Sequence, residues 1–227
     1  MYLRQAWTIA AKDLRAEWRT REAVNASLAF MLVILVLFSF AFDPGSSDVN
    51  IQAISGGLLW LAYSFAAALA LNRSFARELQ NDCLDALLAS PISASALFFG
   101  KAFANFALLM AMEIISLGVF SVLYNVKVLT QIWGLLLVIL LGTWAITVMG
   151  TMFSALTVNL RLRELMLPVM MYPSLIVPLT AAITLTSDLL NGIPLRGENL
   201  LWVKVLVAFD VIFTSLVVIL IDTVLVG

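Results

Sequence analysis

Two carboxylates lie inside long apolar runs of this sequence, where an acidic group could relay protons, line a polar path or tie helices together. Glu113 falls near the middle of the run 102–124, and Asp210 falls within the run 201–226. Placing a carboxylate in hydrocarbon costs roughly 2.5–3.5 kcal/mol, so each should face protein or a wet cavity, or be protonated. Two interpretations stay open: a substrate or proton path, and hydrogen-bond ties between helices.

Most other site chemistry is excluded by residue types. The chain has no histidine and one cysteine, Cys83, which removes the commonest metal ligand, a histidine-activated nucleophile and an internal disulfide. The only Gly-Lys pair, Gly100-Lys101, has Ser95 where a phosphate-binding loop needs glycine and Ala102 where it needs Ser or Thr. We therefore expect no catalytic residue, no metal site and no nucleotide site, and any ATP would be hydrolysed by another subunit.

The composition indicates a polytopic membrane protein. Of 227 residues 63% are hydrophobic and 12% are charged, and the mean hydropathy is +1.04. A soluble domain has about 25% charged residues. The net charge of -1, without a basic tract, does not suggest a nucleic-acid partner. Six runs are long enough for a spanning helix and lack the alternation of a membrane strand: 23–42, 51–71, 102–124, 132–156, 165–185 and 201–226.

The basic residues predict the orientation of these spans. The connections on the N-terminal side hold ten Lys and Arg, and the opposite side holds the other three of the 13. Basic residues favour the cytoplasmic side, so we expect both termini and the stretch 71–101 there. The two sets are Arg4, Lys12, Arg15, Arg19, Arg21, Arg73, Arg77, Lys101, Arg161 and Arg163, against Lys127, Arg196 and Lys204.

Residues 1–22 have the pattern of an amphipathic helix that lies on a membrane. Trp7, Leu14 and Trp18 recur along one helical stripe, and charged residues surround it. Tryptophans favour the headgroup level, and arginines can face lipid phosphates and water. We therefore expect an interfacial helix ahead of a six-helix domain at 23–227. A secretory signal peptide is the competing interpretation, which the long charged lead disfavours.

The longest polar interruption, 71–101, predicts a short amphipathic helix between the second and third spans. Leu84, Leu87 and Leu88 share one helical face, and Asp82 and Asp85 add charge. Ser90-Pro91 should end this helix, because proline disfavours helical geometry in the preceding residue, and Ser93 can cap the next one. Such a helix could dock into a partner on the water side, and a solvated connector is the alternative.

The fifth run carries three prolines, Pro168, Pro173 and Pro178, spaced five residues apart. Each proline removes a backbone donor and presses on a carbonyl one turn back, so we expect a helix that is kinked or broken repeatedly. It could form a pliable wall of a translocation path, or its kinks could be static. The glycines Gly56, Gly57, Gly134, Gly142 and Gly150 favour close helix packing.

Five segments carry a resemblance to a known family: KDLRAEWRTRE at 12–22, LFSFAF at 37–42, ALNRSFARELQNDCLDALLASPISASALFFGK at 70–101, GTMFSALTVNLRLRELMLP at 150–168 and FDVIF at 209–213. Together they resemble the CcmB family, the membrane subunit of the ABC-type system for cytochrome c maturation. The resemblance implies an all-α permease-like fold, with 1–22 as its elbow helix and 82–89 as the coupling helix on the ATPase. The short tail after Asp222 departs from the charged tail expected of the family.

The resemblance also implies partners and a function. The expected partners are an ABC ATPase like CcmA, the haem-handling protein CcmC, small CcmD, the haem chaperone CcmE and a second copy of the chain. The chain would couple ATP hydrolysis to haem export or to release of the loaded chaperone, in the bacterial cytoplasmic (inner) membrane, without being an enzyme. ATP and haem would be bound by partners. The alternatives are an ABC permease for another lipid, glycan or drug, and an ion-coupled transporter that uses Glu113 and Asp210.

Overall fold

The computed structural model of the protein describes residues 2–42, 51–75, 93–158, 160 and 162–226, with side chains for all of these except 51–53 and 222–226. Every regular element in these ranges is helical, which confirms the predicted all-α fold. The elements are α1 (Tyr2–Thr20), α2 (Glu22–Phe42), α3 (Ile51–Asn72), α6 (Ala94–Leu123), the 3-10 turn η1 (Val128–Gln131), α7 (Ile132–Thr157), α8 (Arg163–Leu190) and α9 (Asn199–Val226).

Six of the described helices, α2, α3 and α6 to α9, are long and apolar enough to cross a membrane. The shortest, α2, has 21 residues, which at 1.5 Å per residue spans a hydrocarbon core of about 30 Å. All six coincide with the runs expected from the sequence, so the prediction of six spanning helices is confirmed.

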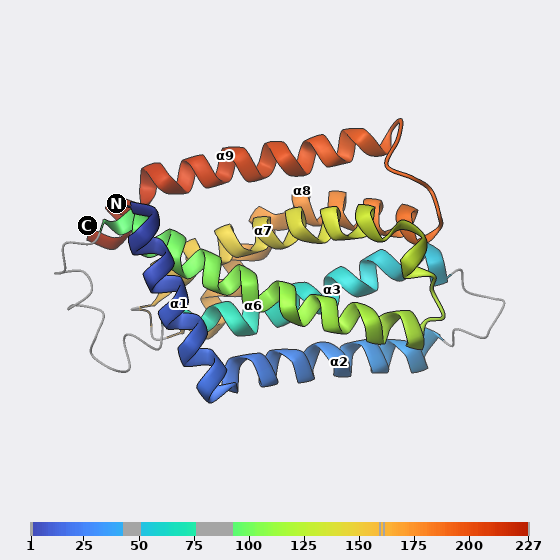
Figure 1. Ribbon diagram of the computed structural model, residues 1–227, viewed down its shortest axis with the longest axis horizontal. Helices are drawn as coiled ribbons and strands as arrows, with labels where there is room; N and C mark the ends of the chain where they lie inside the picture. The colour runs from blue at the N-terminus through green and yellow to red at the C-terminus, as the bar shows by residue number, and fades with distance from the viewer. Residues whose placement is uncertain (1, 43–50, 76–92, 159, 161, 227) are drawn as a thin grey trace.

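The six helices lie side by side along the long axis of the molecule, with α2 and α9 at opposite edges (Figure 1). α3 and α7 form the interior, since 67% and 56% of their apolar windows are buried, against 28% for α2 and for α9. α3 packs against α2 and α8, and α7 packs against α8 and α9. α1 runs transverse to the spans at the end where both termini lie, and it packs against α6 (Figure 1).

Glycines bring the interior helices together, as expected. A Cβ at Gly142 would collide with the ring of Trp60, and one at Gly150 with Leu71, so α7 touches α3 at two levels. Gly56 and Gly134 are crowded in the same way. Gly57 differs, because nothing described lies within 4 Å of a Cβ built there. The packing role predicted for it is therefore wrong.

α8 is continuous through Pro168, Pro173 and Pro178, so of the two forms expected, a kinked helix and a broken one, the break does not occur. A proline frees the carbonyl four residues earlier, which for Pro168 is that of Glu164. The Asn72 side chain donates to this carbonyl at 3.4 Å. A neighbouring helix thus supplies a donor that the proline removed, which is how spanning helices tolerate proline.

Candidate functional site

Lys101 is a buried cation near the start of α6, with 1% of its surface exposed. Its Nζ donates to the backbone oxygen of Ser74 at 2.8 Å and to Oδ2 of Asp13 at 3.2 Å. The same nitrogen lies 4.8 Å from the ring centroid of Phe75. Burial of a charge is costly unless the charge is paired and hydrogen-bonded, and both conditions hold here. Lys101 therefore joins α1, α6 and the end of α3.

Gly100 explains how α1 comes close enough for this contact. A Cβ at position 100 would lie 2.6 Å from Cβ of Ile9 and 2.8 Å from the backbone oxygen of Ala6, so only glycine permits this approach. Asp13 follows Ile9 by four residues and therefore shares its helical face. The close approach of α1 at Gly100 carries the Asp13 carboxylate to the neighbouring Lys101.

Asn105, one turn further along α6, also holds the end of α3. Its Nδ2 donates to Oγ of Ser74 at 2.9 Å and to Oγ1 of Thr151 on α7 at 3.0 Å. Oγ of Ser154 donates to the backbone oxygen of Leu71 at 2.8 Å. The last carbonyls of a helix have no α-helical donor, and Ser154 supplies one to Leu71, while Asn105 links the hydroxyls of Ser74 and Thr151. Helices α6 and α7 thereby fix the position at which the chain leaves α3.

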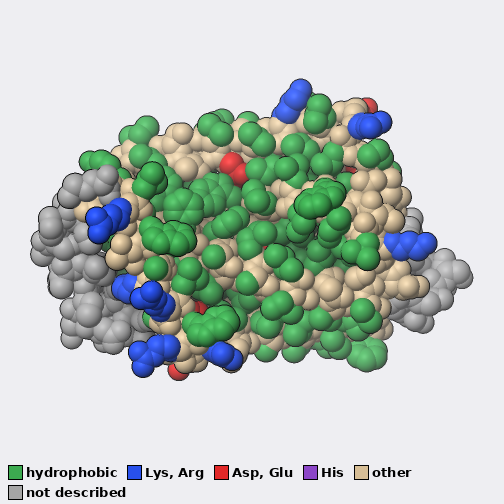
Figure 2. Space-filling model, viewed as in Figure 1, with side chains coloured by type: hydrophobic (Ala, Val, Ile, Leu, Met, Phe, Trp, Pro, Cys, Tyr) green, Lys and Arg blue, Asp and Glu red, His purple; other side chains and the backbone are tan. Residues whose placement is uncertain are grey.

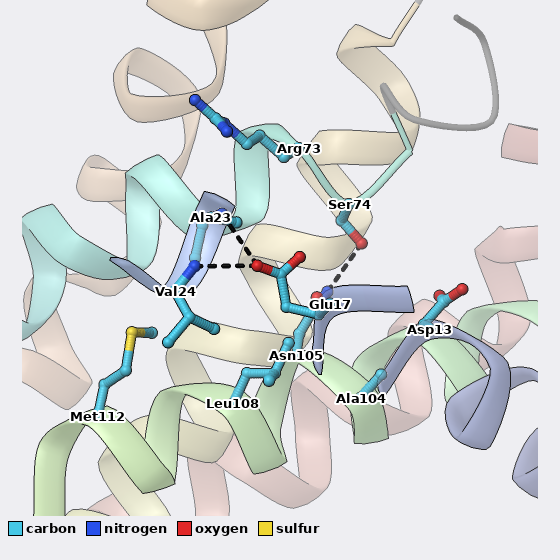
Figure 3. A pocket seen from close by; sticks show the side chains of 11 residues that line it. Asp13, Glu17, Ala23, Val24, Arg73, Ser74, Ala104, Asn105, Leu108 and Met112 are labelled. Carbon is cyan, nitrogen blue, oxygen red and sulfur yellow. Dashed lines mark hydrogen bonds between the residues drawn. The ribbon is translucent and has the colours of Figure 1, made fainter. Parts of the chain in front are cut away.

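Glu17 caps the start of α2, as the side chains above bind the end of α3. Its Oε1 accepts from the backbone nitrogens of Ala23 at 2.9 Å and Val24 at 3.0 Å (Figure 3), and 4% of the residue is exposed. These amides belong to the first turn of α2, where helix donors are otherwise unpaired. Arg21, between the two helices, has a φ of 53°. A left-handed corner and a side-chain cap together set the angle between α1 and α2.

We call Asp13, Glu17, Ser74, Lys101 and Asn105 the Lys101 cluster. A cavity of about 50 Å³ lies at this cluster, with Arg73, Leu108 and Met112 in its wall (Figure 3). One water needs about 10–15 Å³ of such volume, so the cavity has room for a few waters and none for a porphyrin. The geometry suits a junction that holds helix ends.

Glu113 lies in α6 and is fully buried. Its Oε2 accepts a hydrogen bond from Thr143 on α7, and its backbone oxygen accepts from the hydroxyl of Tyr63 on α3 at 3.1 Å. Oε1 has no hydrogen-bond partner within the described part of the chain. Glu113 thus links three helices while one of its oxygens is unpaired.

Asp210 lies on the inner side of α9, with 8% of its surface exposed. Neither carboxylate oxygen has a hydrogen-bond partner among the residues that the structure describes. One turn away, Thr214 accepts a hydrogen bond from Nε1 of Trp144 on α7 at 3.1 Å. The tie between α7 and α9 is therefore made by Thr214 and not by the acid.

Comparison with known proteins decides the family. The family model described as "CcmB protein" matches residues 4–223, nearly the whole chain. The chain belongs to the CcmB family. It is 32% identical over 165 residues to "Heme exporter protein B" of Rhodobacter capsulatus, covering 73% of this chain and 74% of that one. It is 27% identical over 206 residues to the protein of the same name from Pseudomonas aeruginosa, covering 91% of both.

The family assignment confirms the resemblance seen in the sequence. With its six apolar helices, this member of the CcmB family is a multi-pass membrane protein. The predicted coupling-helix residues lie outside the described residues: Asp82, Leu84, Asp85, Leu87 and Leu88. Ser93 caps α6 as predicted, since its Oγ accepts from the backbone nitrogen of Ala96 at 3.2 Å.

Two large aromatic residues of the spans, Trp60 and Tyr124, are buried and hydrogen-bonded. Trp60 is 1% exposed and its Nε1 donates to Oγ1 of Thr186 at 2.8 Å, while the hydroxyl of Tyr124 donates to the backbone oxygen of Leu35 at 2.9 Å. Both side chains therefore serve the packing of this CcmB-family bundle. Phe42 is half-buried at the end of α2.

The Lys101 cluster was missed by reasoning from the sequence, which counted Lys101 only as a basic residue facing water. One signal was available: Lys101 and Asn105 are spaced by four residues inside a mostly apolar helix. Asp13 and Glu17 show the same spacing on α1. Matching polar pairs on two helices favour contact between them, but the sequence does not show that these two helices meet.

Proposed function

We propose that this chain is the membrane subunit of an ABC-type complex for cytochrome c biogenesis, in which a partner ATPase drives haem export or release of the haem-loaded chaperone. The observation that carries the proposal is the match of the CcmB family over residues 4–223, with relatives named "Heme exporter protein B". Six apolar helices suit a permease. ATP hydrolysis then belongs to a partner, since the sequence contains no phosphate-binding loop.

The ATPase would dock on the helix expected at 82–89, within the segment 76–92, through the leucine face of Leu84, Leu87 and Leu88. Two described features support this assignment. The chain enters the segment from the end of α3 and leaves it at the Ser93 cap of α6, and the Lys101 cluster fixes the α3 side to both α1 and α6. A docking segment must be held firmly at its base if the movement of a partner is to reach the spans.

The N- and C-termini lie at the same end of the bundle (Figure 1), which also carries the exposed Arg4, Arg15, Arg19 and Arg73. Under the positive-inside rule this end faces the cytoplasm of a bacterium, with the bundle in the inner membrane. A Ser46→Cys variant should then react with an impermeant thiol reagent from outside intact cells, and native Cys83 only after permeabilisation. The reverse pattern would invert the topology.

Haem would be held by other members of the assembly. A protein without histidine lacks the usual axial ligand of haem iron. The expected partners are two ATPase subunits like CcmA, a haem-handling protein like CcmC, a small subunit like CcmD, the chaperone like CcmE and a second copy of this chain.

The test is ATP hydrolysis by the assembled complex carrying Leu84→Asp with Leu87→Asp. Charge on the leucine face should lower hydrolysis and cytochrome c formation at equal yield of this chain in the membrane. The matched control is Ala86→Asp with Ala89→Asp, which adds the same charge to the opposite face of the expected helix and should leave hydrolysis nearly unchanged. Equal hydrolysis in both double variants would reject the docking assignment.

A further inference from the structure

The acidic and the basic residues of α1 lie on different faces of the helix. Its acids, Asp13 and Glu17, point into the bundle, toward Lys101 and toward the first amides of α2. The other oxygen of Asp13, Oδ1, lies 3.1 Å from Nζ of Lys12, so this lysine is paired with the neighbouring acid. Its basic side chains are exposed: Arg4, Lys12, Arg15 and Arg19. Figure 2 shows Lys and Arg gathered at the end of the bundle that α1 crosses, next to hydrophobic side chains. The sequence of α1 is of mixed charge, but its outward face is basic.

A shallow groove of about 580 Å³ runs along this outward face. Two alanines, Ala11 and Ala16, contribute small side chains to it, and Trp7 lies at one end. Lys12, Arg15 and Arg19 are spaced by three and four residues, so they share one side of the helix over about 10 Å. We call the surface of Trp7, Thr8, Ala11, Lys12, Arg15, Ala16 and Arg19 the α1 groove.

The α1 groove lies at the level where the first span begins. α1 ends at Thr20 and α2 begins at Glu22, so no linker separates the groove from the spans. Trp7 and Trp18 are 70% and 76% exposed, as in the aromatic belts that mark the headgroup level of a bilayer. The guanidinium of Arg21 lies 5.3 Å from the ring centroid of Trp18. Lipid headgroups are therefore the molecules that this surface meets.

We propose that the α1 groove binds the phosphate of an anionic phospholipid and selects it over zwitterionic lipids. Arg15 and Arg19, with Lys12 beside its partner Asp13, attract a phosphate over a floor of small side chains, and a choline headgroup would bring a further cation against them. Trp7 would lie against the glycerol and upper acyl region. An acidic protein segment would satisfy the charges but would leave the two exposed tryptophans without an apolar environment. This inference does not rest on the proposed transport function.

The test measures the thermal unfolding of the purified full chain in detergent with added lipid. Phosphatidylglycerol should raise the unfolding midpoint more than phosphatidylcholine with the same acyl chains. Lys12→Gln with Arg15→Gln and Arg19→Gln should weaken binding of phosphatidylglycerol on the order of 100-fold, from the usual contribution of each basic residue near an anionic surface. The control is Lys127→Gln with Arg196→Gln and Lys204→Gln, which removes the same charge from exposed sites at the opposite end and should keep the response.

Each alternative result overturns the proposal. An equal rise with phosphatidylcholine would show that lipid charge is not recognised. Loss of the response in the control would show a general charge effect, and a response reproduced by inorganic phosphate would show a free-anion site. Stable capture of an acidic protein, with no lipid effect, would make the groove a protein interface. If the triple variant does not fold, Arg15→Gln with Arg19→Gln gives the same comparison on two exposed side chains.

Discussion

The Lys101 cluster and the two acids within the spans are both buried and polar, but their hydrogen bonding differs. Lys101 donates to two acceptors and lies over an aromatic ring, and one oxygen of Glu17 accepts from two amides. One side-chain oxygen of Glu113 accepts a hydrogen bond, and neither carboxylate oxygen of Asp210 does so in the described part of the chain. The polar groups at the end of the bundle are hydrogen-bonded, while each of the two acids inside it leaves at least one oxygen without a partner among the described residues.

The difference follows from where helices end. The last carbonyls and first amides of a helix have no partners within it, so a buried charge near helix ends finds backbone partners at hand. Lys101 uses the carbonyl of Ser74, just past α3, and Glu17 uses the first amides of α2. In the middle of a span the backbone groups are paired with one another, so an acid needs a side chain such as Thr143. Loss of a hydrogen-bonded group such as Lys101 should therefore lower the stability of the fold most. An acid without partners, such as Asp210, contributes little to stability and is open to a functional role.

Lys101→Met should have the largest effect on stability. Removing one partner of a buried pair costs about 3–5 kcal/mol, and we expect the lower end because the Asp13 side chain is 21% exposed and regains water. The free energy of unfolding in mixed micelles measures the loss. Lys127→Met, at an exposed site on the opposite end, is the control and should be nearly neutral. Equal stability of the two variants would mean that the Lys101 cluster does not hold the bundle together.

Glu17→Ala should come next, with a loss of about 1 kcal/mol, because a cap of two amides disappears. Glu17→Gln keeps an oxygen that can accept from Ala23 and Val24, and it should lose only the attraction of a negative charge to the helix start, about 0.3–1 kcal/mol. The same unfolding measurement compares them. A glutamine variant as unstable as the alanine variant would show that charge, and not capping, is what stabilises this corner.

Thr143→Val should cost less, about 0.6 kcal/mol, the average for a hydrogen bond between membrane helices. It removes the donor to Glu113 and keeps the shape of the side chain. Thr147→Val is the matched control, since in the described part of the chain the Thr147 hydroxyl donates within α7, to the backbone oxygen of Thr143 at 2.7 Å. If both valine variants lose the same stability, Glu113 is not an interhelical tie.

Asp210→Asn should change stability least, by less than about 0.5 kcal/mol, because no described group donates to either oxygen. Cytochrome c formation in cells should be measured on the same variant. A stable variant that forms no cytochrome c would assign a functional role to this acid. A loss of stability above about 1 kcal/mol would contradict the account, since it would require a hydrogen bond to Asp210 that the fold does not provide.

The spans could be predicted because length and apolar composition decide them with little help from the rest of the chain. The start of α6 could also be predicted: the apolar run begins at 102, but the helix itself begins at Ala94, directly after the Ser93 cap that the sequence indicated. The continuity of α8 was not predictable, because the donor to the carbonyl freed by Pro168 is Asn72, 92 residues away. A local rule about proline cannot include a distant neighbour.

The Lys101 cluster could not be predicted for the same reason. In sequence, Lys101 looks like a solvated residue at the start of a span, and Asp13 is 88 residues away. Their pairing depends on the approach of α1 to Gly100, which is a property of helix packing. The family was recognisable from the sequence because its segments are spread along nearly the whole chain.

The most direct test of the account is the absorption spectrum of this chain purified alone and together with its haem-handling partner. A subunit that works mechanically and has no histidine should show no stoichiometric, axially ligated Soret band by itself. The band should appear when the partner is present. A stoichiometric Soret spectrum of an axially ligated haem in the isolated chain would contradict the proposal that haem iron is held by the partners.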